Sequence, residues 1–107
     1  MPAITSLTNA VAASTGFPLD GTVLYSNHVM IVSTTGTCTG GSVQLRGSLD
    51  GVSYYALGGP VPITTSNAVY APLVISDEPN RFLRADVISP ITGGGSVTVQ
   101  VGMSSSV

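Results

Sequence analysis

The stretch Ser42–Leu57, SVQLRGSLDGVSYYAL, decides the fold class of this sequence. In its first half apolar and polar side chains alternate, with Val43 and Leu45 on one face, as in a half-buried strand. An Asp-Gly dipeptide at 50–51 follows directly and favours a two-residue turn, because both central residues of that turn need a positive φ. The stretch therefore predicts a β-hairpin.

The two-residue turn also fixes the register of the hairpin. It places Leu45 opposite Ala56 on one face and Arg46 opposite Tyr55 on the other. A cross-strand contact between the guanidinium of Arg46 and the ring of Tyr55 is therefore expected.

Further strand patterns flank this hairpin on both sides. Residues 22–26, 28–33, 68–75, 81–89 and 96–103 are β-branched or alternate in polarity. Pro62 indicates an edge strand or a loop, and Pro72 indicates an edge strand or a bulge. Leu83, Ala85 and Val87 are expected to share one face of their strand, and Val69, Ala71, Leu73 and Ile75 one face of theirs. Inward positions are expected for Val97, Val99, Val101 and Met103. The pattern predicts an all-β domain, an antiparallel β-sandwich or jelly roll of about seven or eight short strands.

The first twenty residues are less regular than the rest. Leu7, Ala10 and Val11 have helix-like spacing, but threonines dilute it, so the segment fits a short strand, a helical turn or an extended arm. We expect an N-terminal arm or peripheral segment over residues 1–20 and a β-sandwich domain over residues 21–107. The first residues lack the basic region and apolar run of a signal peptide, so synthesis in the cytoplasm is expected.

The chain carries very little charge. Only 7% of its residues are charged, against about 25% in a typical domain, and there is no lysine. A net charge of −2 and three arginines argue against binding to nucleic acid or to an anionic membrane surface. So little charge fits either a Ser/Thr-rich soluble surface or a surface that is covered in an assembly.

No constellation of catalytic or metal-binding residues stands out. The single histidine, His28, lies in a strand pattern without a matching nucleophile and acid, which favours a structural or surface role. Cys38 is the only cysteine and has no nearby positive charge to activate it. We therefore expect no enzyme activity, no catalytic residue, no metal site and no cofactor.

Two further groups of residues have ordinary interpretations. Asp77 and Glu78 are adjacent in a turn, which favours solvated side chains, with a calcium site as the alternative. The glycines at 93–95 lack the lysine and the following helix of a phosphate-binding loop. Exposed tyrosines are the better binding candidates, and Tyr55, Tyr70 and Arg46 are the residues expected to contact a partner. Because Tyr54 and Tyr55 are adjacent on a strand, one of them is expected in the core.

Two stretches resemble a known group of proteins. The segment 44–55, QLRGSLDGVSYY, and the later segment 80–87, NRFLRADV, followed by a glycine loop and SVTV at 96–99, are similar to small β-sandwich virion proteins of tailed bacteriophages. Discoidin-like and carbohydrate-binding sandwiches share a similar hairpin and ending. The resemblance covers roughly residues 42–102, and nothing in residues 1–41 contributes to it.

The resemblance implies a structural role in a virus particle. The leading expectation is a capsid decoration (cement) or minor capsid protein that is made in the host cytoplasm and binds the major capsid protein on the outer surface of the head. A homo-oligomer, with a trimer as one form, would fit the low charge. The alternative is a carbohydrate- or receptor-binding module of a phage tail or fibre.

Overall fold

The computed structural model describes residues 2–104, and this part of the chain contains nine strands and no helix. The strands are β1 (Ala3–Ala10), β2 (Ser14–Thr15), β3 (Leu19–Tyr25), β4 (Asn27–Thr35), β5 (Gly40–Ser48), β6 (Tyr55–Pro62), β7 (Leu73–Ile75), β8 (Asn80–Thr92) and β9 (Ser96–Ser104).

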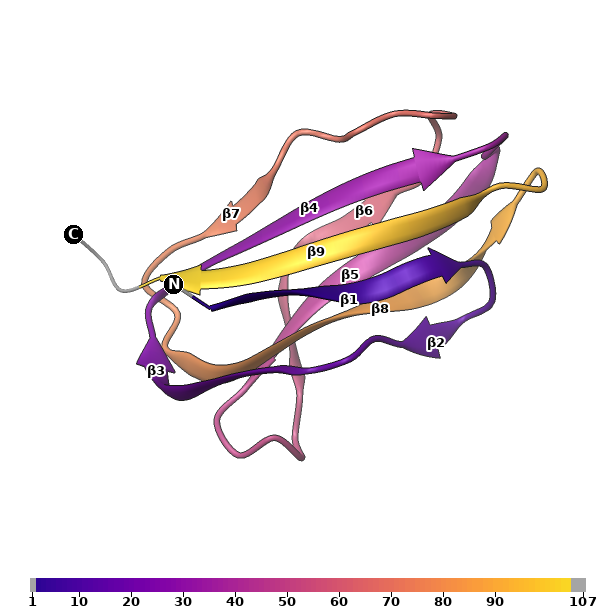
Figure 1. Cartoon of the computed structure of the whole chain (residues 1–107). Helices are drawn as coiled ribbons and strands as arrows, with labels where there is room; N and C mark the ends of the chain where they lie inside the picture. The colour runs from indigo at the N-terminus through magenta and orange to yellow at the C-terminus, as the bar shows by residue number, and fades with distance from the viewer. Residues whose placement is uncertain (1, 105–107) are drawn as a thin grey trace.

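The strands form two sheets that face each other (Figure 1). Sheet A has the order β1-β9-β4-β7, and sheet B has the order β2-β8-β5-β6, with β3 also pairing with β8. Every strand pair is antiparallel. The predicted all-β antiparallel sandwich is confirmed, and the strand count is higher than expected because residues 3–10 and 14–15 form strands as well.

The core lies between the two sheets. The inward faces predicted for β8 and β9 are confirmed, since Leu83, Ala85, Val87, Val97, Val99, Val101 and Met103 are all buried. They pack with apolar side chains from the other strands, chiefly Leu7, Leu19, Met30, Val32, Val43, Leu45, Leu57 and Ile63. Burial of each Val, Leu, Ile or Met side chain in this core contributes roughly 1.5–3 kcal/mol, so the contact between the two sheets is a main source of stability.

The hairpin of β5 and β6 exists, but its predicted turn and register are wrong. Leu45 pairs with Leu57 and Arg46 pairs with Ala56, a slip of one residue. Side chains in the turn cause the difference, because they accept hydrogen bonds from its backbone. The Ser48 hydroxyl accepts from the N–H of Gly51 at 2.9 Å, and the Asp50 carboxylate accepts from Val52 and Ser53 at 2.8 and 2.9 Å.

The slip changes which side chains face the core. Side chains alternate between the two faces of a strand. A shift of one residue in the pairing therefore changes which residues of β6 lie on the same face as a given residue of β5. Leu57 packs beside Leu45 in the core, while Ala56 is exposed. The expected contact between Arg46 and Tyr55 does not form, because Tyr55 pairs with Gly47 instead.

The segment expected as an arm or peripheral segment over residues 1–20 contributes to both sheets in its described part. β1 pairs with β9 along sheet A, with two bulges, and β2 pairs with β8 in sheet B. Ser6 ties the two sheets together, because its hydroxyl accepts from the N–H of Ala85 and donates to the carbonyl of Phe17. Residues 3–10 therefore form a strand at the edge of sheet A, and not a helical turn or an extended arm.

The alternation predicted over residues 68–75 is only partly correct. Leu73 and Ile75 pack against the core as expected, but Val69 and Ala71 are exposed. Pro72 has no N–H for a ladder, so continuous pairing with β4 begins only at Leu73. Before it, Val69 makes a single bridge to Ser33.

Candidate functional site

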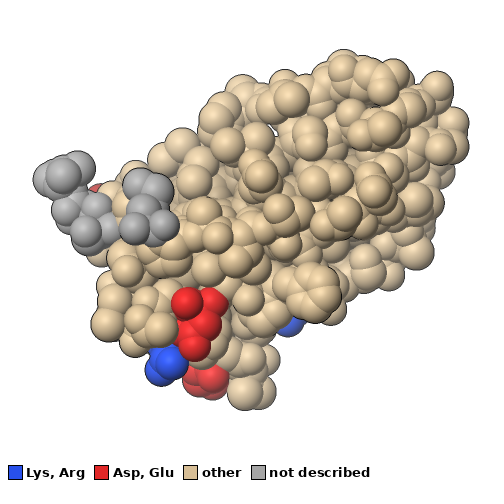
Figure 2. Space-filling model, viewed as in Figure 1, with Lys and Arg blue, Asp and Glu red and all other residues tan. Residues whose placement is uncertain are grey.

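The outer face of sheet A is free of charge. None of its four strands contains Asp, Glu, Lys or Arg. All three arginines and all five acidic residues lie in sheet B or in loops. Figure 2 shows the contrast, because the surface over β1, β9 and β4 carries no coloured atoms, while most red and blue atoms lie toward the end near β3 and a further blue group lies along the lower edge. Sheet A therefore presents a neutral face.

Small and aliphatic side chains form this neutral face. One row across the sheet joins Val74, Val29, Gly102 and Ala3, which are direct neighbours in the ladders. A shallow hollow of about 90 Å³ lies at this row, with Val29, Val74 and Gly102 in its lining. The next row joins Ile31, Gln100 and Thr5. The face offers aliphatic carbon, hydroxyl and amide groups, which suits contact with another uncharged surface.

The outer face of sheet B carries a charge cluster at its centre. The register places Arg46 of β5 directly opposite Arg84 of β8, and Asp86 follows two residues later on the same face. The Asp86 carboxylate lies 3.0 Å from Nε of each arginine. The side chain of Asp86 is only 7% exposed, whereas those of Arg46 and Arg84 are 32% and 24% exposed. The predicted shared face of Arg84 and Asp86 is confirmed.

Tyr54 completes this cluster. Its ring lies over the guanidinium of Arg84, with 3.9 Å between Cζ and the ring centre. Burial raises the pKa of the Tyr54 hydroxyl above its ordinary value, with Arg84 acting in the opposite direction. Sequence reasoning missed this contact, because the assumed two-residue turn brought Tyr55 and not Tyr54 to an arginine.

The three residues expected to bind a partner do not form one site. Tyr55 is 42% exposed, and its hydroxyl donates to the side-chain oxygen of the buried Asn80. The hydroxyl of Tyr70 accepts from the N–H groups of Thr64 and Thr65, both at 2.9 Å. Both tyrosines thus hold their own chain in place, and Arg46 lies apart from them in the charge cluster.

His28 has a structural position. It is almost fully buried, and its Nε2 lies 2.6 Å from the carbonyl of Glu78, to which it donates. Burial lowers the pKa of the imidazole below its usual value of 6.5, although the Glu78 carbonyl and carboxylate oppose the effect. Asn80 donates to the same carbonyl at 3.0 Å. This network joins β4 to the turn before β8, so the structural interpretation of His28 holds and the surface alternative does not.

The other titratable candidates are not brought together. Cys38 is buried against the core, and Asp77 and Glu78 are exposed in their turn. Within residues 2–104, no three His, Cys, Asp or Glu side chains are close enough to hold a metal ion. The same residues include no helix long and apolar enough to cross a membrane.

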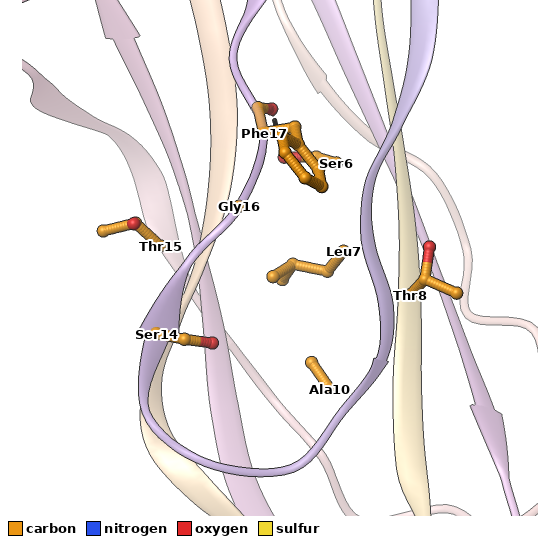
Figure 3. Close-up of a pocket in the computed structure, with 8 residues that line it drawn as sticks. All are labelled: Ser6, Leu7, Thr8, Ala10, Ser14, Thr15, Gly16 and Phe17. Carbon is orange, nitrogen blue, oxygen red and sulfur yellow. Dashed lines mark hydrogen bonds between the residues drawn. The ribbon is translucent and has the colours of Figure 1, made fainter.

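A larger hollow lies at the open edge of the sandwich. It has a volume of about 470 Å³ and is lined by residues 6–8, 10 and 14–17, between β1 and β2. Figure 3 shows Leu7, Ala10 and Ser14 pointing into it, whereas Thr8 and Thr15 point away. The N–H of Phe17 donates to the carbonyl of Ser6 where the two segments meet, and beyond that contact they diverge. The hollow is therefore the space left where the two sheets separate.

Comparisons with known proteins identify the fold. No protein family and no curated protein matches this sequence. Among solved structures, the chain is similar to the SPBc2 prophage-derived protein YomS, with 17% identity and a TM-score of 0.63 over 94% of this chain and 92% of that one. It is also similar to CBM32-1 from a family 31 glycoside hydrolase of Clostridium perfringens, with 16% identity and a TM-score of 0.54 over 92% of this chain and 75% of that one. The class of protein is thus a small β-sandwich whose fold is shared with a prophage-derived protein and with a carbohydrate-binding module.

Proposed function

We propose that this chain is a structural protein of a phage particle, a decoration (cement) or minor capsid protein that binds the outer surface of the head. Its partner is the major capsid protein, and the neutral face of sheet A makes the contact. The role is one of binding and stabilisation, without catalysis, and its location is the capsid surface. Association of several copies, such as a trimer, is part of this proposal.

The observation that carries the proposal is the absence of charge from sheet A. Burying an unpaired charge in an interface costs several kcal/mol, so a face without Asp, Glu, Lys or Arg is easily covered. The molecule measures 39 × 27 × 20 Å, and its broadest side is large enough for a standard interface of about 800 Å² per partner.

The fold comparison supports the same role. YomS is described as prophage-derived, and its chain and this one match over nearly their whole lengths. The resemblance of residues 44–55, 80–87 and 96–99 to phage virion sandwiches agrees with that fold. Many copies that each bury a modest surface would add up to a large stabilisation of the head.

The experiment is a binding assay with phage heads. Particles of the phage that encodes the chain are purified, their proteins are identified by mass spectrometry, and stripped heads are mixed with the purified protein and sedimented. We expect the chain in the particles and saturable binding to the heads. Val74→Arg, which adds a charge to an exposed position of sheet A, should weaken binding at least about tenfold.

Ile88→Arg is the matched control, because Ile88 is an exposed aliphatic residue on β8 of sheet B. It should bind as the wild type does. Absence of the chain from purified particles, together with no binding to heads, would remove the proposal. Loss of binding in Ile88→Arg but not in Val74→Arg would assign the contact to sheet B.

The second candidate is a carbohydrate- or receptor-binding module of a tail or fibre. The similarity in fold to CBM32-1 favours it, as does the partly exposed ring of Tyr54 on sheet B. A glycan panel separates the two candidates. Binding that is lost in Tyr54→Ala, or in Tyr55→Ala and Tyr70→Ala as expected from the sequence, would favour this module, whereas no signal on any glycan would count against it.

A further inference from the structure

Two arginines lie close together on the outer face of sheet B, and a negative charge is needed to offset their repulsion. Arg46 and Arg84 are directly opposite each other in the ladder of β5 and β8. Like charges at such positions repel and destabilise a sheet. Asp86 relieves this repulsion, because its two oxygens contact Nε of Arg84 and Nε of Arg46, each at 3.0 Å.

One carboxylate balances only one of the two guanidinium groups. The cluster therefore keeps a net charge of about +1 in a chain whose overall charge is −2. The charge of the third arginine, Arg81, is balanced by a different carboxylate. Arg81 donates two hydrogen bonds to Asp20, at 2.9 and 3.2 Å. The cluster of Arg46, Arg84 and Asp86 is thus locally positive, and Asp50, in the loop between β5 and β6, is the nearby acid that acts on Tyr54 without an arginine partner.

The terminal nitrogens of Arg46 are available to a ligand. Asp86 contacts Arg46 at Nε, and residues 2–104 offer no hydrogen-bond partner to its two terminal nitrogens. The guanidinium of Arg84 is held by the Tyr54 ring and by Asp86, so its position is restricted before a ligand arrives. A planar guanidinium presents paired N–H groups that match the two oxygens of a carboxylate.

The geometry points to a binding site for a small carboxylate at Arg46 and Arg84, with Tyr54 as its wall. A single negative charge matches the excess of the cluster better than a doubly charged phosphate. A small ligand is favoured over a protein surface, because Tyr54 belongs to the loop between β5 and β6, in which Leu49 and Val52 are exposed, and this loop projects beyond the sandwich (Figure 1). A uronic acid carries a single carboxylate on a small ring and is therefore one ligand of this class.

The site is independent of the proposed contact with the phage head. It lies on sheet B, whereas that contact involves the outer face of sheet A. A failure to bind carboxylates would leave the capsid proposal intact, and a failure to bind heads would leave this site intact.

The test is an NMR titration of the full chain with sodium glucuronate at low salt. The Nε–H signals of Arg46 and Arg84 report directly on the site, and glucose serves as the uncharged control. We expect saturable shifts of both signals with glucuronate and none with glucose. Arg46→Gln should weaken binding about tenfold or more, since it removes charge-assisted hydrogen bonds.

Arg81→Gln is the matched control, because it removes an arginine of the same chain outside the cluster. It also releases the charge of Asp20, which acts on Tyr54, so it should weaken glucuronate binding far less than Arg46→Gln does. Arg46→Lys keeps the charge without the paired donors, and its affinity should lie between those of the wild type and Arg46→Gln. No saturable shift with glucuronate, or an equal loss in Arg81→Gln and Arg46→Gln, would overturn the site. Tighter binding of N-acetylaspartate methylamide than of glucuronate would overturn the sugar acid and favour a protein side chain as ligand.

Discussion

Sheet A and sheet B cover the same core, but their outer faces are stabilised in different ways. Sheet A presents small and aliphatic side chains, such as Val29 and Val74, that need no charged partner. Sheet B holds Arg46, Arg84 and Asp86 in mutual contact at its centre. Sheet A can therefore be covered at little electrostatic cost, whereas sheet B depends on its own ion pairs.

The ion pairs of sheet B are expected to matter for stability. Asp86→Ala leaves Arg46 opposite Arg84 with no intervening carboxylate, and both Nε atoms are buried. We expect a loss of about 2–4 kcal/mol in the free energy of unfolding, less than for a fully buried pair because both guanidinium groups are partly exposed. Urea denaturation followed by circular dichroism measures it.

Gln100→Ala provides the matched change on sheet A. Gln100 is exposed at the centre of the neutral face, so its truncation should alter stability by no more than about 0.5 kcal/mol. If both variants lost the same stability, the contrast between the two faces would not hold.

The buried His28 predicts a dependence of stability on pH. Burial lowers the pKa of folded His28, so the unfolded chain takes up a proton below its ordinary pKa of 6.5 while the folded chain stays neutral. The stabilisation is complete above pH 6.5 and decreases as the pH falls from there toward the lowered pKa. The slope can reach about 1.4 kcal/mol per pH unit for one proton.

Denaturation at a series of pH values between 7 and 5 measures that slope. The chain has one histidine, so His28→Gln should make the profile flat in this range whatever its effect on overall stability. Asp20 and Asp50, whose pKa values are lowered by Arg81 and by backbone N–H groups respectively, act only at more acidic pH. An unchanged slope in His28→Gln would assign the effect to another group.

A smaller effect is expected in the loop between β5 and β6. Gly51 has a φ of +78°, and a Cβ at this position would lie 3.1 Å from the ring of Phe82. Gly51→Ala should therefore lower the free energy of unfolding by about 1 kcal/mol. Thermal unfolding measures the loss, and binding to phage heads should not change because the loop belongs to sheet B. Reduced binding would place the loop in the contact.

The sequence pattern was sufficient for the fold class and for the inward faces of β8 and β9, because strict alternation over those strands leaves one choice of buried face. It was insufficient for β1, where bulges make the neighbouring Ser6 and Leu7 both buried. It also misplaced the hairpin register, since the side chains of Ser48 and Asp50 stabilise a longer turn than the Asp-Gly dipeptide alone indicates.

The two candidate sites were also only partly predictable from the sequence. The shared face of Arg84 and Asp86 follows from their spacing in the sequence. The position of Arg46 beside them depends on the pairing register of β5 and β8, which the local sequence did not determine. The neutral face could not be predicted from the sequence for a similar reason. The segments 3–10, 27–35 and 96–104 each lack charge, yet only the strand order shows that they are neighbours.

Thiol labelling on phage heads tests most directly whether the neutral face of sheet A contacts the capsid. The native Cys38 is only 2% exposed, so a cysteine introduced at Gln100 on sheet A or at Ile88 on sheet B dominates labelling by a maleimide, with the wild type as the blank. We expect binding to heads to slow labelling of Gln100→Cys at least about tenfold and to leave Ile88→Cys unchanged. Protection of Ile88→Cys with free labelling of Gln100→Cys would contradict the assignment of the neutral face as the capsid contact.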